Sequence, residues 1–164
     1  NLKTAIEAYA LLPDQIRKQY ELVLIGHPES QSGAVRELAG QMGLAGSVRI
    51  FEPAPDEDLL YFYKLASIFV FPSLYEGFGL PVIEAMAAGC PIICSNATCL
   101  PEIVGDGALL VDPLNKEEWR DNILMVLESG QLRNSLIKKG QTRASQFSWE
   151  KSVQEHLKLY YAKN

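Results

Sequence analysis

One segment near the middle of the chain constrains the fold most, because it reads as a strand, a tight turn and a helix start in direct succession. The apolar residues 68–71 are typical of a buried strand, which ends at Pro72. The turn that follows carries Gly77 and Gly79, and residues 82–88 are rich in helix formers. A strand that passes through a turn into a helix is the repeating unit of parallel α/β sheets.

The rest of the chain repeats this alternation. Strand-like and helix-like runs follow one another at short spacing, which predicts an α/β fold in one domain: a Rossmann-like parallel sheet with helices on both faces. The expected strands are residues 21–26, 47–51, 68–71, 91–94 and 108–111. The expected helices are residues 2–11, 31–43, 56–65 with Asp56 as the N-cap, 82–88, 100–104, 115–127, 132–145 and 149–161.

The central turn predicts an anion-binding site framed by two carboxylates. Main-chain N–H groups of Phe78, Gly79 and Leu80 would point out of a helix N-terminus, where they can bind a phosphate. Glu76 precedes this turn, and Glu84 follows about one helical turn into the helix. Two negative charges would repel a bare phosphate, so a ligand with hydroxyls beside its phosphates, such as a nucleotide-sugar, fits better. The alternative is that Glu84 only favours the helix dipole and Glu76 only caps the turn.

The residues from Glu76 to Glu84 read E-G-F-G-L-P-V-I-E and resemble the E-x7-E motif of retaining GT-B glycosyltransferases. The resemblance is to the large family that includes bacterial mannosyltransferases, sucrose synthases and glycogen synthases. It covers nearly the whole chain, through blocks in the family's order at residues 85–91, 95–96, 100–102 and 105–113. It implies that this chain is the donor-binding, C-terminal half of a GT-B fold.

The resemblance also implies a role for each residue of the site. Glu76 would be the catalytic residue beside the donor sugar, and Glu84 would bind the ribose. The diphosphate would meet the backbone of Gly77, Phe78, Gly79 and Leu80.

Three residues at the carboxyl ends of the first two expected strands, or directly after them, complete the donor site. Gly26 would open on the same edge of the sheet, because ligands of such folds lie at the carboxyl ends of the strands. Phe51 and Glu52 stand where the base would lie in the resemblance, although the family often has a glycine where Glu52 stands. His27 also follows the first strand, and a turn histidine without a function is an equally good interpretation.

The resemblance implies a hexosyltransferase of polysaccharide biosynthesis. Its donor would be a GDP-sugar or UDP-sugar, with GDP-mannose slightly favoured, and its acceptor a glycan, a lipid or a small molecule. No cofactor and no metal are expected, since backbone N–H groups and basic residues would hold the phosphates. Two alternatives stay open at this point. The chain could be a non-catalytic nucleotide-sugar-binding module, or part of a nucleotide-sugar epimerase with a GT-B-like fold.

Composition excludes other classes of protein. The net charge of −5 and the pI of about 5.1 argue against a nucleic-acid partner. No apolar run reaches the ~18 residues that a transmembrane helix needs, and peripheral membrane association of the parent enzyme stays open. Cys90, Cys94 and Cys99 form no Cys-x-x-Cys pair, which favours buried thiols in a reducing, cytoplasmic compartment over disulfides or a metal site.

Basic residues are scarce around the expected site. Between Phe51 and Asn115 there are nine acidic residues and one base, Lys64. In the resemblance, family members carry an arginine and a lysine in the loop after the first strand of this domain, and this chain would begin just inside the far end of that loop, at Asn1. We therefore expect a fragment that lacks one strand, both bases and the N-terminal acceptor domain. It should be inactive alone, and the apolar stripe on its last helix should promote self-association.

Overall fold

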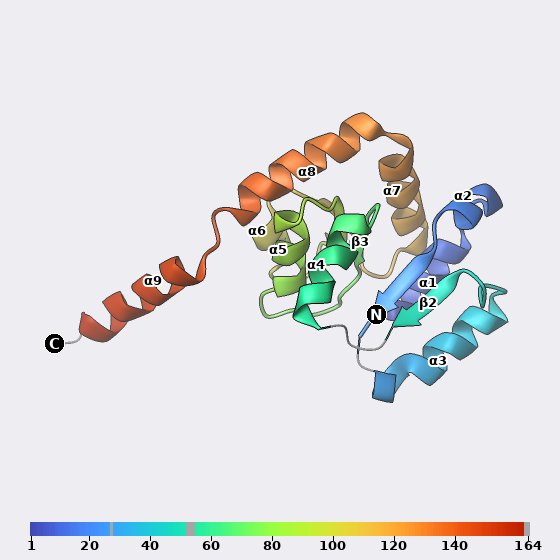
Figure 1. Cartoon of the computed structure of the whole chain (residues 1–164), viewed down its shortest axis with the longest axis horizontal. Coiled ribbons are helices and arrows are strands. Elements are labelled where there is room, and N and C mark those ends of the chain that lie inside the picture. Colours follow the sequence, from blue (N-terminus) through green and yellow to red (C-terminus); the bar gives the residue numbers. More distant parts are fainter. Residues whose placement is uncertain (27, 52–54, 163–164) are drawn as a thin grey trace.

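The computed structural model describes residues 1–26, 28–51 and 55–162, and strands and helices alternate along them (Figure 1). The first half contains α1 (Leu2–Ala10), α2 (Asp14–Gln19), β1 (Leu22–Ile25), α3 (Pro28–Gln41), β2 (Val48–Phe51) and α4 (Asp56–Leu65). The second half contains β3 (Phe69–Phe71), α5 (Leu80–Ala87), β4 (Ile92–Ser95), α6 (Leu100–Val104), β5 (Leu109–Val111), α7 (Lys116–Glu128), α8 (Gly130–Ala144) and α9 (Trp149–Tyr161).

All strand pairs among the described residues are parallel, which confirms the expected α/β fold class. The strands form two sheets, however, and not the single sheet that the alternation predicts. β1 pairs with β2, and β3, β4 and β5 form a second sheet in that order. Within the described part of the chain, β1 and β3 each have a strand partner on one side only.

The central strand β4 shows that helices cover both faces of the larger sheet. All four of its residues are buried, as is usual for a strand between two layers of helices. Ile93 packs in the cluster that contains Ile6 of α1 and Trp119 of α7. Its neighbour Ile92 packs in the other cluster, with Met86 of α5. Successive side chains of a strand point to opposite faces, so the two clusters lie on opposite sides of the sheet.

The sequence predicted most elements to within a few residues, and four details were wrong. The helix α3 begins at Pro28, three residues before its expected start at residue 31. The polar helix α2 was not predicted, because its six residues carry no buried apolar stripe. The N-cap of α4 is Pro55, so that Asp56 is already the first helical residue. The helix α8 begins at Gly130 and not at residue 132, since the side chain of Ser129 accepts a hydrogen bond from the main-chain N–H of Leu132.

The last helix, α9, extends away from the rest of the molecule (Figure 1). Its expected apolar stripe is present and open to solvent, and Trp149 and Tyr160 are about three-quarters exposed, at 74% and 75%. No residue of α9 is buried. The self-association expected from this face stays a prediction.

Candidate active site

The turn between β3 and α5 has the backbone geometry that the glycines predicted. Gly79 is the N-cap of α5 and has a left-handed φ of 89°, which side chains with a Cβ rarely adopt. A Cβ built on Gly79 would lie 2.8 Å from Cδ2 of Leu100, a buried core residue. Pro81 occupies the first turn of α5, where its missing N–H removes no helical hydrogen bond. The sequence here therefore forms a close-packed helix start.

The main-chain N–H groups at this helix start are free. Those of Gly77, Phe78, Gly79 and Leu80 donate no hydrogen bond to any other residue that the structure describes. The side chains of Phe78 and Leu80 are 46% and 45% exposed, so this end of α5 faces solvent. Free N–H groups at the positive end of a helix dipole are well suited to bind an anion.

Glu76 is half-buried and is held at its carboxylate and at its main chain. The hydroxyl of Ser73 donates a hydrogen bond of 2.7 Å to Oε1 of Glu76. The main-chain N–H of Glu76 donates to Oγ1 of Thr98, at 3.2 Å. The carboxylate thus takes part in the local turn, which is the alternative given above for Glu76. In the sequence, Glu76 directly precedes the residues whose N–H groups are free. Neither Ser73 nor Thr98 was identified from the sequence.

Glu84 lies on α5, within about one turn of the free N–H groups, and is exposed. The hydroxyl of Tyr63, on α4, donates a hydrogen bond of 3.1 Å to Oε2 of Glu84. Burial raises the pKa of the Tyr63 hydroxyl, and the negative charge of Glu84 raises it further. The hydroxyl therefore stays protonated and remains a donor. Tyr63 was not identified as a site residue from the sequence, since no local pattern links residues 21 positions apart.

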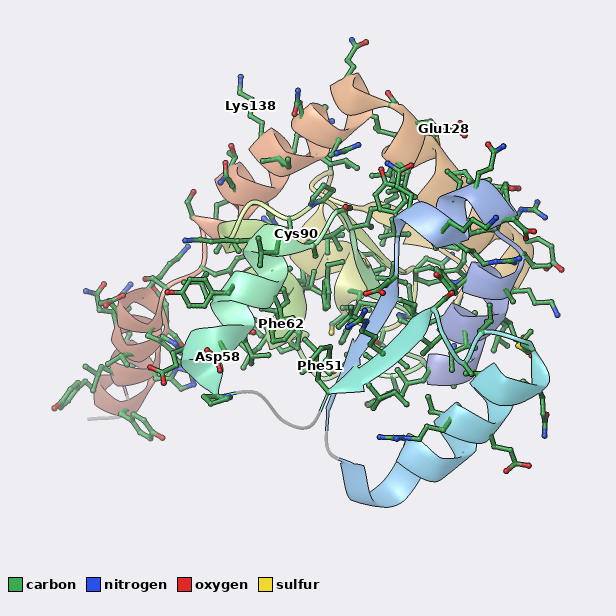
Figure 2. The ribbon with its side chains drawn as sticks, turned by 45° about the vertical axis from the view of Figure 1, so that its right-hand side comes forward. Phe51, Asp58, Phe62, Cys90, Glu128 and Lys138 are labelled. Carbon is green, nitrogen blue, oxygen red and sulfur yellow. The ribbon has the colours of Figure 1, made fainter. Side chains whose placement is uncertain are left out.

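Gly26 and Phe51 meet at the carboxyl ends of β1 and β2. The main-chain N–H of Gly26 donates to the carbonyl oxygen of Phe51 at 3.5 Å, a long contact. The Phe51 ring is 40% exposed and packs edge-on against Phe62 of α4, with 5.4 Å between ring centroids (Figure 2). Phe62 is the neighbour of Tyr63, so α4 contacts both Phe51 and Glu84. Two other expected positions, His27 and Glu52, lie outside the described residues.

No group of three or more His, Cys, Asp or Glu side chains within the described ranges could hold a metal ion. The expectation of a metal-free site overlooks one Asp-x-Asp sequence, Asp56-Glu57-Asp58, of which Asp58 is exposed in the first turn of α4 (Figure 2).

A surface cavity of about 380 Å³ lies away from this site, between Asp106 and α8. Two basic side chains that line it already have partners: Lys139 pairs with Asp106, and Arg143 donates to main-chain carbonyls of α6.

The family of the chain follows from its sequence. A family model described as "Glycosyl transferases group 1" matches residues 1–143. The chain belongs to this family. The resemblance carried by residues 76–84 is thereby confirmed at the level of the family.

Named relatives agree with this assignment. The chain is 39% identical over 160 residues to an O-antigen chain mannosyltransferase B of Escherichia coli, covering 98% of this chain and 42% of the relative. It is 37% identical over 162 residues to the serotype-specific mannosyltransferase WbdA of Escherichia coli, covering 97% of this chain and 20% of the relative. The solved structure of a sucrose-phosphate synthase from Thermosynechococcus elongatus matches with a TM-score of 0.87 and 30% identity, over 98% of this chain and 41% of that one.

The chain therefore spans less than half the length of these relatives. The fold is similar as well, because the GT-B structure of the sucrose-phosphate synthase can be superposed on nearly all of this chain, with its parallel sheets and flanking helices. Among the described residues, no helix is long and apolar enough to cross a membrane.

Proposed function

We propose that this group 1 domain is the donor-binding half of a retaining hexosyltransferase. The parent enzyme moves a mannose- or glucose-type sugar from a nucleoside-diphosphate sugar to a glycan, lipid or small-molecule acceptor. The observation that carries the proposal is the run of free N–H groups at residues 77–80, placed between Glu76 and Glu84. An anion site between two carboxylates suits a ligand that carries phosphates and hydroxyls together.

The free N–H groups bind the diphosphate in this proposal, and each glutamate accepts hydrogen bonds from one sugar. Glu84 is fixed on α5, where its carboxylate accepts hydrogen bonds from the ribose diol and Tyr63 orients it. Glu76 lies on the turn, where Ser73 holds its carboxylate toward the transferred sugar. Gly26, Phe51 and Glu52 are proposed to lie near the base, and Phe51 is partly exposed there.

The reaction proceeds by substitution on one face of the sugar in this proposal. The bond from the anomeric carbon to the phosphate oxygen breaks, and its electron pair leaves with the phosphate. The acceptor oxygen bonds to the same face of the carbon, and its proton passes to the departing phosphate. Positive charge develops on the sugar ring as the first bond breaks, and the carboxylate of Glu76 stabilises this charge without bonding to the carbon.

The remainder of the protein supplies the other half of the site. The acceptor-binding domain, one further strand and the bases that neutralise the diphosphate are proposed to lie outside residues 1–164. No nucleic acid takes part, and the enzyme is proposed to act in the cytoplasm. In an O-antigen chain mannosyltransferase B 39% identical to this chain, the transferred sugar is mannose by name, which places GDP-mannose first among donors to test.

Titration of the full-length protein with GDP, UDP and ADP, followed by a transfer assay with the matching sugar donor, tests the proposal. We expect one of the three diphosphates to bind and its donor to be consumed only when an acceptor is present. Binding without transfer would instead indicate a non-catalytic nucleotide-sugar-binding module. Binding of none of the three would refute the donor site altogether.

The same assay in excess chelator tests the absence of a metal requirement. We expect transfer to persist, because main-chain N–H groups and bases compensate the phosphate charge in this proposal. A complete loss that added divalent ions restore would contradict it. The variant Asp58→Asn would then show whether the Asp-x-Asp sequence at the start of α4 holds the ion.

A further inference from the structure

One loop contacts both the main-chain N–H and the main-chain carbonyl oxygen of Glu76. This loop, residues 96–99, joins β4 to α6. Oγ1 of Thr98 accepts the main-chain N–H of Glu76 at 3.2 Å, and Sγ of Cys99 donates to the carbonyl oxygen of Glu76 at 3.3 Å. The next residue, Leu100, lies so close to Gly79 that no Cβ fits between them. Thr98 and Cys99 of the loop and Leu100, the first residue of α6, therefore all contact the turn that carries Glu76.

Thr98 makes its contact from a strained backbone. Its φ of 52° makes it the one residue other than glycine with a positive φ in the part of the chain that the structure describes. A β-branched side chain is disfavoured in this region, where glycine is the usual residue. A glycine at this position would remove the strain and would also remove the hydroxyl that accepts the N–H of Glu76. Strain of this kind is concentrated at functional sites, where the surrounding structure maintains it.

The short helix α6, which follows this loop, is anchored at its C-terminal end. Arg143 of α8 donates from Nε to the carbonyl oxygen of Ile103, at 2.9 Å, and from Nη2 to that of Glu102, at 2.6 Å. These carbonyls belong to the last turn of α6, which directly follows the loop. A charged donor at a helix C-terminus is favourable for both groups. The loop is thus held between α8 and the Glu76 turn.

We propose that Thr98 is a positioning residue for Glu76. The inference rests on the proposed function, because it assigns to Thr98 the placement of the charge that acts on the donor sugar. Thr98 acts on the peptide of Glu76 and Ser73 acts on its carboxylate, so that backbone and side chain are fixed independently. A carboxylate that must stabilise a developing charge loses efficiency when its position relaxes by a fraction of an ångström.

Three substitutions at Thr98 in the full-length enzyme separate positioning from folding. Thr98→Ala and Thr98→Gly both lose the hydroxyl, and we expect each to lower kcat about tenfold while the dissociation constant of the nucleoside diphosphate changes less than about twofold. Thr98→Gly also relieves the strain, so its stability should equal or exceed that of the wild type. Thr98→Ser keeps the hydroxyl and should retain most of the activity. Thr142→Ala is the matched control, because the exposed Thr142 hydroxyl donates only to a carbonyl within α8.

Amide exchange tests the contact without any enzyme assay. In the 164-residue chain, the Glu76 N–H should exchange faster in Thr98→Ala than in the wild type or Thr142→Ala, since its acceptor is lost. Unchanged exchange, or wild-type kcat in both Thr98→Ala and Thr98→Gly, would overturn the inference. An equal loss of nucleotide binding, stability and kcat in both variants would assign Thr98 to folding alone and overturn it as well. Failure of the wild-type enzyme to transfer sugar would refute the proposed function, and the exchange result would still decide the contact.

Discussion

The two glutamates of the site differ in how the protein holds them. Glu84 is on a helix, and its carboxylate accepts a hydrogen bond from the hydroxyl of Tyr63. Glu76 is on a turn, and its main chain and carboxylate are fixed by three different side chains. An exposed carboxylate on a rigid helix suits a contact that stays the same throughout the reaction. A carboxylate held from several sides suits a charge that must be placed before the reaction begins.

These differences predict that the two substitutions to glutamine affect different kinetic quantities, donor affinity for Glu84 and turnover for Glu76. Glu84→Gln removes the charge that accepts the ribose hydrogen bonds, each of which contributes about 1.5–3 kcal/mol to binding when the acceptor is charged. This substitution should therefore mainly weaken donor binding. Glu76→Gln should lower turnover by about a hundredfold or more, with donor affinity less affected. Glu128→Gln, an exposed change at the C-terminal end of α7 (Figure 2), is the control. Turnover and donor dissociation constants of the three full-length variants test the assignment, and reversed effects for Glu76 and Glu84 would show that the roles are exchanged.

The sequence predicted those residues of the site that a local pattern defines. The glycines and the two glutamates occur within nine successive positions, and the left-handed Gly79 and the free N–H groups follow from them. The residues that hold the site were not predictable in this way. Tyr63 and Thr98 lie 21 and 22 positions from their partners, and tertiary packing alone brings them into contact.

Two buried thiols predict how stability depends on pH. Burial raises the pKa of Cys90 and of Cys94 from an ordinary 9.0 to about 12. Below pH 9 both states of the protein hold these protons, and the contribution to stability is complete. Between pH 9 and 12 the unfolded chain loses the protons first, so stability falls as the pH rises. Urea unfolding from pH 8 to 11 should show this decrease, and Cys94→Ala should show a smaller one than Cys99→Ala, whose thiol is only half-buried.

At the scale of elements, the site depends on the close packing of α8 against the α5 and α6 region. Gly140 of α8 lies against Met86 of α5 and against the turn at Gly107. Helical periodicity predicted that α8 and α5 exist but not that they touch, because the contact joins Gly140 to Met86, far apart in the sequence. The small residues allow the backbones to approach, and Arg143 then reaches the carbonyls of α6.

Gly107→Ala tests this packing. A Cβ on Gly107 would lie 2.9 Å from Cα of Gly140 and 3.2 Å from the carbonyl oxygen of Val104, and backbone atoms cannot rotate away. We expect the free energy of unfolding to fall by about 1–3 kcal/mol, the usual cost of overpacking. Gly130→Ala is the control, since this position is open and helical, and alanine there should stabilise by about 0.4–1 kcal/mol. Equal stability of the two variants in urea unfolding would contradict the close approach.

At the scale of the whole molecule, local sequence patterns do not explain why the strands are divided into two sheets. Strand order and pairing depend on contacts between distant segments, so the sequence predicted strands but not their division into two sheets. In doubly wound folds the first strand lies in the middle of the sheet. A parallel strand between β1 and β3 would join the two sheets, since each of these strands has a partner on one side only within the described residues. The expected strand outside this chain stays a prediction.

The last prediction concerns the 164-residue chain by itself. It contains both glutamates and the free N–H groups, but Lys64 is the one base between Phe51 and Asn115, against nine acidic residues. Main-chain N–H groups alone compensate a diphosphate poorly. We therefore expect the chain to bind the nucleoside diphosphate more weakly than the full-length protein does, and to transfer no sugar.

Calorimetry and a radiolabelled-sugar assay on the chain and on the full-length protein check this. Glu84→Gln in the isolated chain is the control for specific binding, because weak binding at the proposed site should decrease further when the ribose contact is lost. Binding that Glu84→Gln leaves unchanged would place the nucleotide elsewhere. Sugar transfer by the 164 residues alone would show that acceptor, bases and catalytic charge are all contained in them, and that the parent enzyme is not needed to complete the site.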